Sequence, residues 1–379
     1  MNEPRRAATL QVPADATPGA PHVRDATDLR RLVRRAVVAL IPCALFGVCN
    51  AGRQANRMLS DGDGLRGGPG TVLGAAGMAV AAPSFAADAV QGLLLFVPVC
   101  VVAFATGTLW ERVFAARRGH RAPGLALAVL PFTLALPPTI ALWQVAVGMS
   151  FGIVVAKEIF GGTGKHFLHP GLVALAFLYF AYPDAMRGEA VWVAAEGSPA
   201  ARPLALAASG GIDAVWAAGI PWSATLAGNV PGAFGETSAL ACLLGAALLL
   251  HARMASWRVL LGAVLGVVGA AVVANRLAPA EVPFAGVPWY WHLTLGSFAF
   301  AVVFFATDPV TAAVTNPGRW IYGLLVGALT VLIRVANPVH AEGAMLAVLL
   351  GSVCAPLIDR LVVSANVRRR LRRGGRRGP

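Results

Sequence analysis

Residues 153–171 read IVVAKEIFGGTGKHFLHPG, so a lysine–glutamate pair and a run of Gly, Thr, His and Pro interrupt a long apolar stretch. Backbone that is not helical is tolerated at membrane depth only where it is buried in protein or lines a cavity. Charged side chains at that depth are costly and are retained mainly for function. The interruption therefore predicts a ligand site inside the membrane, where helices are broken.

The composition of the whole chain supports a membrane setting. Of its 379 residues, 57% are hydrophobic and 13% are charged, whereas a typical soluble domain has about half and about a quarter. The formal net charge of +13 lies mostly in short segments that flank the apolar runs. Such charges indicate membrane orientation and contact with anionic lipid rather than nucleic-acid binding. We therefore expect an integral membrane protein with no DNA or RNA partner.

Apolar windows of about 20 residues predict about ten transmembrane helices, because that length crosses a hydrocarbon core of about 30 Å. The expected fold is all-α and polytopic. The spans are predicted near residues 36–48, 89–109, 125–142, 145–156, 172–182, 237–250, 259–274, 293–306, 321–335 and 344–363.

Basic residues cluster before the first predicted span and after the second, sixth and tenth spans. With ten spans these clusters fall on one side, so the positive-inside rule predicts that both termini are cytoplasmic. No signal-peptide pattern precedes the first span, which would itself direct insertion. The predicted domains are a basic cytoplasmic segment at 1–35, a membrane domain at 36–363 with a long periplasmic loop at 183–236, and a basic cytoplasmic tail at 364–379.

The interruption has a counterpart later in the chain. FLHPG at 167–171 and VTNPG at 314–318 each end a break, and each is followed by an apolar span. Two five-helix repeats of inverted topology, with interrupted helices, would bring two such breaks together at the membrane midplane. The alternative is that His-Pro and Asn-Pro only initiate turns.

Other site chemistries find little support in the sequence. The five cysteines stand singly in apolar stretches without C-x-x-C spacing, which argues against a zinc site, a disulfide framework or an iron–sulfur cluster. His166 and His169 could share a helical face toward a metal, but no third ligand accompanies them. No strand followed by G-x-G-x-x-G marks a nucleotide-binding fold. We expect neither a metal site nor an NADH-binding fold.

Segments along nearly the whole chain resemble one family of membrane subunits. The chain is similar to the B-type subunit of the sodium-translocating NADH:quinone reductase and to its sister, the D-type subunit of the Rnf electron-transport complex. The matching segments are His22-Val23-Arg24-Asp25, Asn50-Ala51-Gly52, Lys157-Glu158, FGGTG at 160–164, Pro231-Gly232, Gly235-Glu236, Ser256-Trp257-Arg258, ATDP at 306–309, Thr315-Asn316, Ile333-Arg334-Val335, Asn337-Pro338, Glu342-Gly343 and Ala355-Pro356-Leu357.

The resemblance implies a bacterial inner-membrane subunit that relays electrons and works only with sister subunits. In that family, electrons pass from a flavin on a periplasmic partner to FMN on this subunit, then to riboflavin within it and on to quinone, while sodium crosses the membrane. The implied cofactors are FMN and riboflavin, with ubiquinone as acceptor, and only the assembly would be an enzyme. The alternative is a carrier on the same scaffold that has lost covalent flavin and moves an ion or a small solute.

One family feature is missing from this chain. The family attaches FMN to the threonine of a D-G-x-[ST]-G-A-T motif, and the corresponding stretch 196–202 reads EGSPAAR, so Arg202 replaces the threonine. A guanidinium has no hydroxyl to be phosphorylated, which excludes covalent FMN there. Arg202 could pair with the phosphate of noncovalent FMN, or be an exposed loop residue. Thr225, in a Ser-Ala-Thr sequence outside the expected context, is a second covalent candidate.

The resemblance also implies where riboflavin would bind. His166 and His169 stand where relatives have asparagines lining the riboflavin site, and histidine can still hydrogen-bond or stack on a flavin ring. We therefore expect riboflavin or FMN to be held without a covalent bond. The other candidate flavin contacts in the two breaks are Gly162, Thr163, Lys165, Asp308 and Asn316.

Two residues in ATGTLWE at 105–111 are candidates for quinone contact. Gly107 and Glu111 match the family's quinone-proximal segment, although Thr108 stands where relatives have a second glycine. A small residue permits close approach of a flat ring, and threonine narrows that approach. The alternative is an interfacial glutamate at the headgroup level. Lys157 and Glu158 are expected to pair with other buried charges, because lone charges at that depth are costly.

Overall fold

The structure, a computed structural model, describes residues 29–60, 84–119, 124–187, 191–193, 202–277, 282–337 and 342–374. Within these ranges the regular structure is helical and includes no β-strand. The predicted class, an all-α polytopic membrane protein, is confirmed.

Five helices are long and apolar enough to cross a membrane. The shortest have 21 residues, and at about 1.5 Å per residue this length spans about 30 Å. The five are α1 (Leu29–Ser60), α3 (Phe85–Arg118), α11 (Trp257–Leu277), α14 (Asn316–Ala336) and α15 (Ala344–Gly374).

The other predicted spans are short or interrupted helices. The span predicted at 125–142 is too long, because the helix there ends at Leu134, just before Pro137 and Pro138, and the residue before a proline disfavours helix. The span predicted at 293–306 is split at Gly296, whose φ is +62°. The elements are α4 (Leu125–Leu134), α5 (Leu142–Phe151) with the π-helix η1 (Gly152–Glu158), α6 (Pro170–Ala181), α10 (Ala239–His251), α12 (Trp289–Thr294), and α13 (Phe298–Phe300) with the π-helix η4 (Ala301–Phe305).

The segment 183–236, predicted as a long loop, is helical over much of its described part. It contains α7 (Pro183–Arg187), α8 (Pro203–Ala217) and α9 (Trp222–Ala227). Its content of Pro and Ala indicated a loop, but proline in a first turn and alanine within a helix both favour helix. α8 and the 3-10 helix η3 (Pro283–Gly286) share a small apolar core that includes Val215, Phe284 and Trp291.

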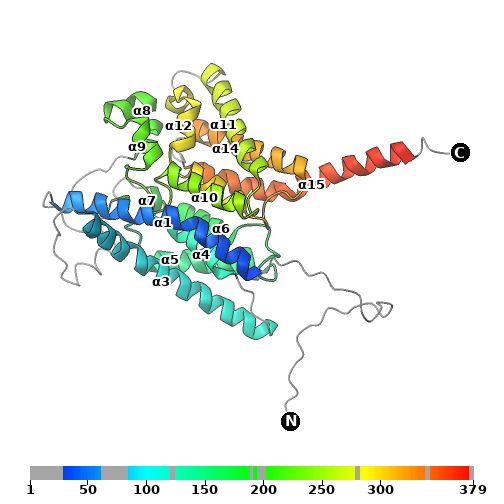
Figure 1. The fold of residues 1–379 in the computed structure, drawn as a ribbon, viewed down its shortest axis with the longest axis horizontal. Helices are drawn as coiled ribbons and strands as arrows, with labels where there is room; N and C mark the ends of the chain where they lie inside the picture. The colour runs from blue at the N-terminus through cyan, green and yellow to red at the C-terminus, as the bar shows by residue number, and fades with distance from the viewer. Residues whose placement is uncertain are drawn as a thin grey trace, which may run out of the picture.

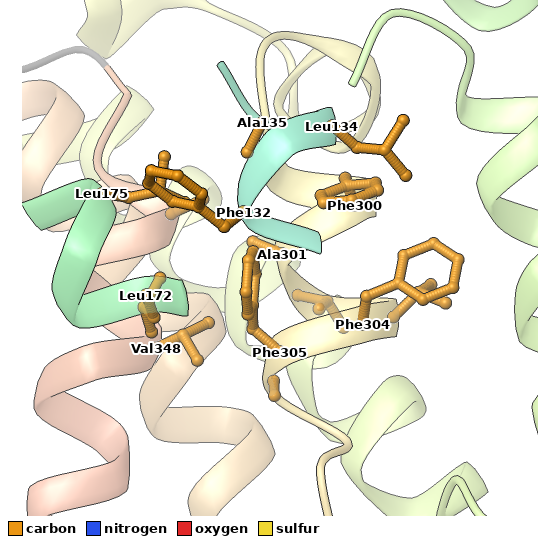
Figure 2. Packing of buried hydrophobic residues seen from close by; sticks show 14 of the residues in the cluster. Phe132, Leu134, Ala135, Leu172, Leu175, Phe300, Ala301, Phe304, Phe305 and Val348 are labelled. Atoms are coloured by element: carbon orange, nitrogen blue, oxygen red, sulfur yellow. The ribbon is translucent and has the colours of Figure 1, made fainter. Parts of the chain in front are cut away.

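One apolar core joins the two halves of the chain. α4 contributes Phe132 and Leu134, and α6 contributes Leu175. These side chains belong to the same cluster as Phe300 of α13 and Phe305 of η4, and all five are at most 4% exposed. Figure 2 shows the phenyl rings between the ribbons of α4, α6 and η4. The core therefore fixes the end of η4 relative to the start of α6.

Basic residues gather at one end of the helix bundle. Arg35, near the start of α1, donates a hydrogen bond of 3.5 Å to the carbonyl oxygen of Ala252, just after α10. Figure 1 shows the C-terminal ends of α3 and α15 on the same side of the molecule as the first turns of α1. The shared end agrees with the charge pattern on which the predicted orientation rests.

α15 continues as a helix beyond the predicted start of the basic tail, as far as Gly374. Earlier in α15, the carboxylate of Asp359 accepts hydrogen bonds from the backbone N–H groups of Val314 and Thr315, at 2.7 and 3.0 Å. Thr315 is the N-cap of α14, and its hydroxyl accepts a hydrogen bond from the N–H of Gly318. α15 therefore holds the start of α14 in place.

α11 and α14 approach each other through glycines. Gly262 and Gly266 of α11 face Gly323 and Gly327 of α14, and a Cβ on Gly327 would overlap the backbone carbonyl oxygen of Ala263. Small residues that allow close backbone approach are a common way for helices to associate in membranes. The α11–α14 contact therefore has no room for a side chain at these positions.

Gly327→Ala should destabilise the protein by about 2 kcal/mol, because overpacking a close helix contact costs about 1–3 kcal/mol. Thermal unfolding of the purified protein in detergent would measure the loss. Gly269→Ala on α11 is the matched control, since an added Cβ there meets no atom within 4 Å. Equal unfolding temperatures for the two variants would contradict the packing argument.

Candidate functional site

The two helix breaks meet at one cavity of about 170 Å³. The first break, 159–169, follows η1, and the second, 306–315, follows η4. The predicted convergence of the breaks is confirmed. They contribute Thr163, Gly164, His166, His169, Thr307, Asp308, Pro309 and Val310 to the wall of the cavity.

Both breaks have the same local construction. Each follows a π-helix, and each ends where a proline occupies the first turn of the next helix, α6 or α14. In the first break Gly161, Gly162 and Gly164 have φ of +105°, +99° and +88°, in a region that strongly favours glycine. The similarity of FLHPG and VTNPG therefore corresponds to a repeated local structure.

Three buried polar atoms around the first break have no hydrogen-bond partner among the described residues. They are Oγ1 of Thr163 and the Nδ1 atoms of His166 and His169. The two histidines are 8% and 5% exposed, and the ring of His169 packs edge-on against Phe305 with centroids 4.8 Å apart. Because buried polar groups are nearly always satisfied, this wall suits a ligand with a polar edge.

The rest of the wall is mostly apolar. It includes Leu32, Ala36, Leu40, Leu127, Ala128, Leu249 and Phe304. Leu32 and Leu40 belong to the first turns of α1, so the cavity lies toward the basic end of the bundle. The predicted midplane position stays a prediction. α5 and η1 run for 10 and 7 residues before the break, which carries the chain most of the way across a bilayer.

Not every residue predicted from the breaks reaches the cavity. Lys165 and Asn316 are exposed and lie outside its wall. Gly162 is buried, and its positive φ shapes the turn that presents Thr163. Asp308 reaches the wall, where its carboxylate accepts a hydrogen bond of 3.1 Å from the hydroxyl of Thr311.

Two ion pairs join the end of α3 to η1. Lys157 pairs with Glu111, and Glu158 pairs with Arg118 at 2.7 Å. The side chains of Lys157 and Glu158 are 2% and 3% exposed. The expected pairing of these two residues with other charges is confirmed. Glu111 therefore points at a buried lysine; its quinone role and its alternative position at the headgroup level both stay predictions.

Gly107 faces protein in this structure. An added Cβ there would lie 2.7 Å from Cδ1 of Leu125, at the start of α4. One turn further on, the indole N–H of Trp110 donates a hydrogen bond of 2.9 Å to the hydroxyl of Ser150 on α5. A quinone ring could reach Gly107 only after Leu125 moves.

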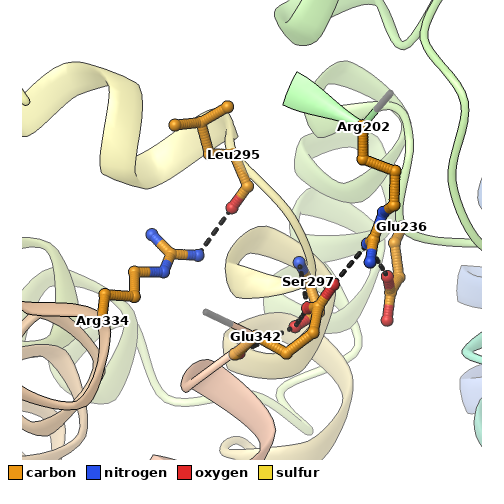
Figure 3. Close-up of polar contacts among 6 residues, drawn as sticks. All are labelled: Arg202, Glu236, Leu295, Ser297, Arg334 and Glu342. Atoms are coloured by element: carbon orange, nitrogen blue, oxygen red, sulfur yellow. Dashed lines mark hydrogen bonds and ion pairs between the residues drawn. The ribbon is translucent and has the colours of Figure 1, made fainter. Parts of the chain in front are cut away.

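A second polar cluster surrounds Arg202 (Figure 3). Its guanidinium pairs with Glu342 and with Glu236, at 3.7 Å from the latter, and lies over the ring of Trp192 at 3.6 Å. The side chain of Arg202 is only 9% exposed. The alternative of an exposed loop arginine is therefore wrong, because the guanidinium is buried between two carboxylates.

Neighbouring groups complete this cluster. The hydroxyl of Ser297 donates a hydrogen bond of 2.8 Å to Glu342. Arg334, fully buried on α14, donates to the carbonyl oxygens of His292 and Leu295 at 2.9 and 2.7 Å. Burial raises the pKa of Glu236 well above its usual range, and the charge of nearby Glu342 adds to the rise.

Neither candidate position fits covalent FMN. Arg202 has no hydroxyl and is held by its ion pairs. Thr225 is 1% exposed, and its hydroxyl donates 2.8 Å to the carbonyl oxygen of Trp222 and lies 3.1 Å from the hydroxyl of Thr294. A phosphoester there would break these bonds in a space closed by protein. Residues 194–201, which include most of the motif-like stretch, lie outside the described residues.

The cluster around Arg202 was missed by reasoning from the sequence. In the sequence, Glu236 and Glu342 stand out only as parts of family-like segments, and Arg334 was expected to serve the second break. Their signal was the presence of isolated charges beside apolar spans, where an unpaired charge is costly. Such a signal indicates that partners exist but does not identify them.

Comparison with known proteins gives a consistent result over nearly the whole chain. The profile of the NQR2, RnfD, RnfE family matches residues 16–368. The B-type subunit of the Na(+)-translocating NADH-quinone reductase of Chromohalobacter salexigens is 47% identical over 372 residues, 97% of this chain and 90% of the relative. Those of Stutzerimonas stutzeri and Azotobacter vinelandii are 44% and 45% identical, over 96% of this chain and 91% of each relative. The chain belongs to the NQR2, RnfD, RnfE family.

Proposed function

We propose that this chain is the B-type membrane subunit of a sodium-translocating NADH:quinone reductase, in the bacterial inner membrane with both termini cytoplasmic. The relatives that carry this name match it over at least 96% of its length. The cavity where the two breaks meet is the observation that supports the electron-relay role, because its mostly apolar wall carries three polar atoms that have no hydrogen-bond partner within the described part of the chain.

A noncovalent flavin, riboflavin or FMN, is the ligand that we propose for this cavity. Bound there, it would supply one- and two-electron transfer toward ubiquinone. Thr163 and His166 would hydrogen-bond the polar edge of the ring system, and His169 would be held in orientation by Phe305. The apolar residues of α1, α4 and α10 would exclude water from the ring faces.

The ion pairs at the end of α3 have a positioning role in this proposal. Lys157 lines the cavity and is held by Glu111. Glu111 would therefore balance the positive charge of Lys157 beside the bound flavin. Quinone would approach along the α3 segment that contains Gly107. Sister subunits would supply the NADH-oxidising site and would pass electrons to and from this chain.

Noncovalent flavin content tests the cavity. Acid precipitation of the purified protein should release flavin into the supernatant, and His166→Ala should weaken flavin binding about tenfold through the loss of ring-edge hydrogen bonds. Fluorescence titration of the flavin-depleted protein measures that affinity. Lys165→Ala is the control, because Lys165 lies outside the cavity wall. Equal affinities for the two variants would contradict the assignment.

The absence of covalent FMN is a separate expectation. A denaturing gel of the intact protein should show no fluorescent band, since Arg202 cannot form a phosphoester. Arg202→Thr, expressed together with the same partner proteins, tests whether a threonine at this position is sufficient for covalent attachment of FMN. A fluorescent band from the unaltered protein would show that another hydroxyl, such as that of Thr225, carries flavin.

The proteins that co-purify with this chain distinguish the electron-relay role from the carrier alternative. Affinity purification of the tagged chain from its native membranes should retain subunits that reduce quinone with NADH, in a sodium-stimulated reaction. A carrier would instead purify without NADH-oxidising activity and without flavin. That pair of results would overturn the proposed function.

A further inference from the structure

Two tryptophans and three arginines gather where α11 and α14 begin. Trp257 is the first residue of α11, and Trp320 lies near the start of α14. Their rings meet edge to face with centroids 5.5 Å apart. The guanidinium of Arg258 lies over the ring of Trp257 at 4.9 Å from its centroid. Arg319 precedes Trp320, and Arg253 lies in the turn between α10 and α11. These five residues are called the α11–α14 basic surface.

The α11–α14 basic surface lies at the basic end of the helix bundle. Arg35, near the start of α1, donates to the carbonyl oxygen of Ala252, in the turn that leads to α11. Trp257 is 50% exposed, and Arg253 is exposed as well. Tryptophan is enriched where a membrane helix leaves the hydrocarbon core, with its ring at the level of the lipid headgroups. The surface is therefore placed to meet headgroups rather than the protein interior.

The arginines of this surface have no anionic partner in the protein. Arginines elsewhere in the bundle pair with carboxylates. Within the described residues, no carboxylate oxygen lies within 4.0 Å of the guanidinium of Arg253, Arg258 or Arg319. Arg319 donates from Nε to the carbonyl oxygen of Ala313 at 3.3 Å, which leaves its two terminal nitrogens for an outside acceptor. Three positive charges therefore remain to be balanced from outside the chain.

Neighbouring polar groups favour an outside anion as well. The carboxylate of Asp359, at the start of α14, accepts from the backbone N–H groups of Val314 and Thr315, so it is already occupied. Ser256 immediately precedes α11, and its buried hydroxyl oxygen has no hydrogen-bond partner among the described residues. The first turn of a long helix also presents N–H groups that suit phosphate oxygens.

We propose that the α11–α14 basic surface binds the headgroup of an anionic phospholipid. The phosphate pairs with Arg258 and Arg319, because a guanidinium matches the geometry of phosphate oxygens. The rings of Trp257 and Trp320 lie along the glycerol and the first carbons of the acyl chains. An acidic protein segment would also balance the charge, but the half-exposed indole beside the arginines favours lipid, since basic pockets between membrane helices bind lipid headgroups. The proposal does not depend on the electron-relay function.

Titration of the purified chain in detergent with dioleoyl phosphatidylglycerol tests the proposal, with bound lipid counted by native mass spectrometry. The double variant Arg258→Gln, Arg319→Gln should bind this lipid about 25-fold more weakly, which is about fivefold for each arginine. The double variant Arg112→Gln, Arg117→Gln is the matched control, because it removes the same charge from exposed positions of α3. It should bind as the unaltered protein does, and dioleoyl phosphatidylcholine should not distinguish the three proteins.

Three results would contradict the proposal. Equal losses of affinity in the two double variants would reduce the surface to general positive charge. If inorganic phosphate stabilises the unaltered protein against unfolding as much as the lipid does, the site takes a free anion. If Arg258→Gln, Arg319→Gln keeps its lipid affinity but loses sister subunits on co-purification, the surface binds an acidic protein segment. Should that variant fail to fold, Arg253→Gln, Arg258→Gln keeps the bond from Arg319 to Ala313 and gives the same comparison.

Discussion

The rest of the structure depends on the need to enclose broken backbone within an apolar protein. Two helices stop short of a full crossing, and the free backbone and polar side chains at their ends must be kept away from lipid. The protein meets this requirement by placing both breaks against one cavity, with the first turns of α1, the start of α4 and the end of α10 around them. The phenyl rings of α13 and η4 pack behind the cavity and hold the two halves together.

Buried charges are paired both near the cavity and in the cluster around Arg202. Near the cavity, α3 supplies one acid and one base that match Lys157 and Glu158 on η1. In the cluster around Arg202, this one arginine pairs with two acids that lie far apart in the sequence. Each pairing joins segments that are distant in the sequence, and removing one partner would leave an uncompensated buried charge.

The sequence predicted the parts of this fold that local patterns encode. Glycines 161, 162 and 164 and the prolines at 170 and 317 located both breaks, and the lone charges at 157 and 158 indicated that partners existed. The helices within 183–236 were not predicted, because proline and alanine suit both loops and helix starts. The depth of the cavity and the burial of Arg202 depend on long-range contacts, which no local pattern specifies. The roles of the candidate flavin and quinone residues remain predictions.

α15 reaches from the cluster around Arg202 to the start of α14. Glu342 stands just before its first turn, Asp359 caps the start of α14 from its middle, and the arginines from 368 to 373 follow on the same continuous helix. Successive residues of a helix are rotated by about 100°. Inserting or deleting one residue between Glu342 and Asp359 would therefore rotate Asp359 away from the start of α14 if Glu342 kept its pairing with Arg202. The number of residues between the two carboxylates thus sets how the cluster around Arg202 and the start of α14 are oriented relative to each other.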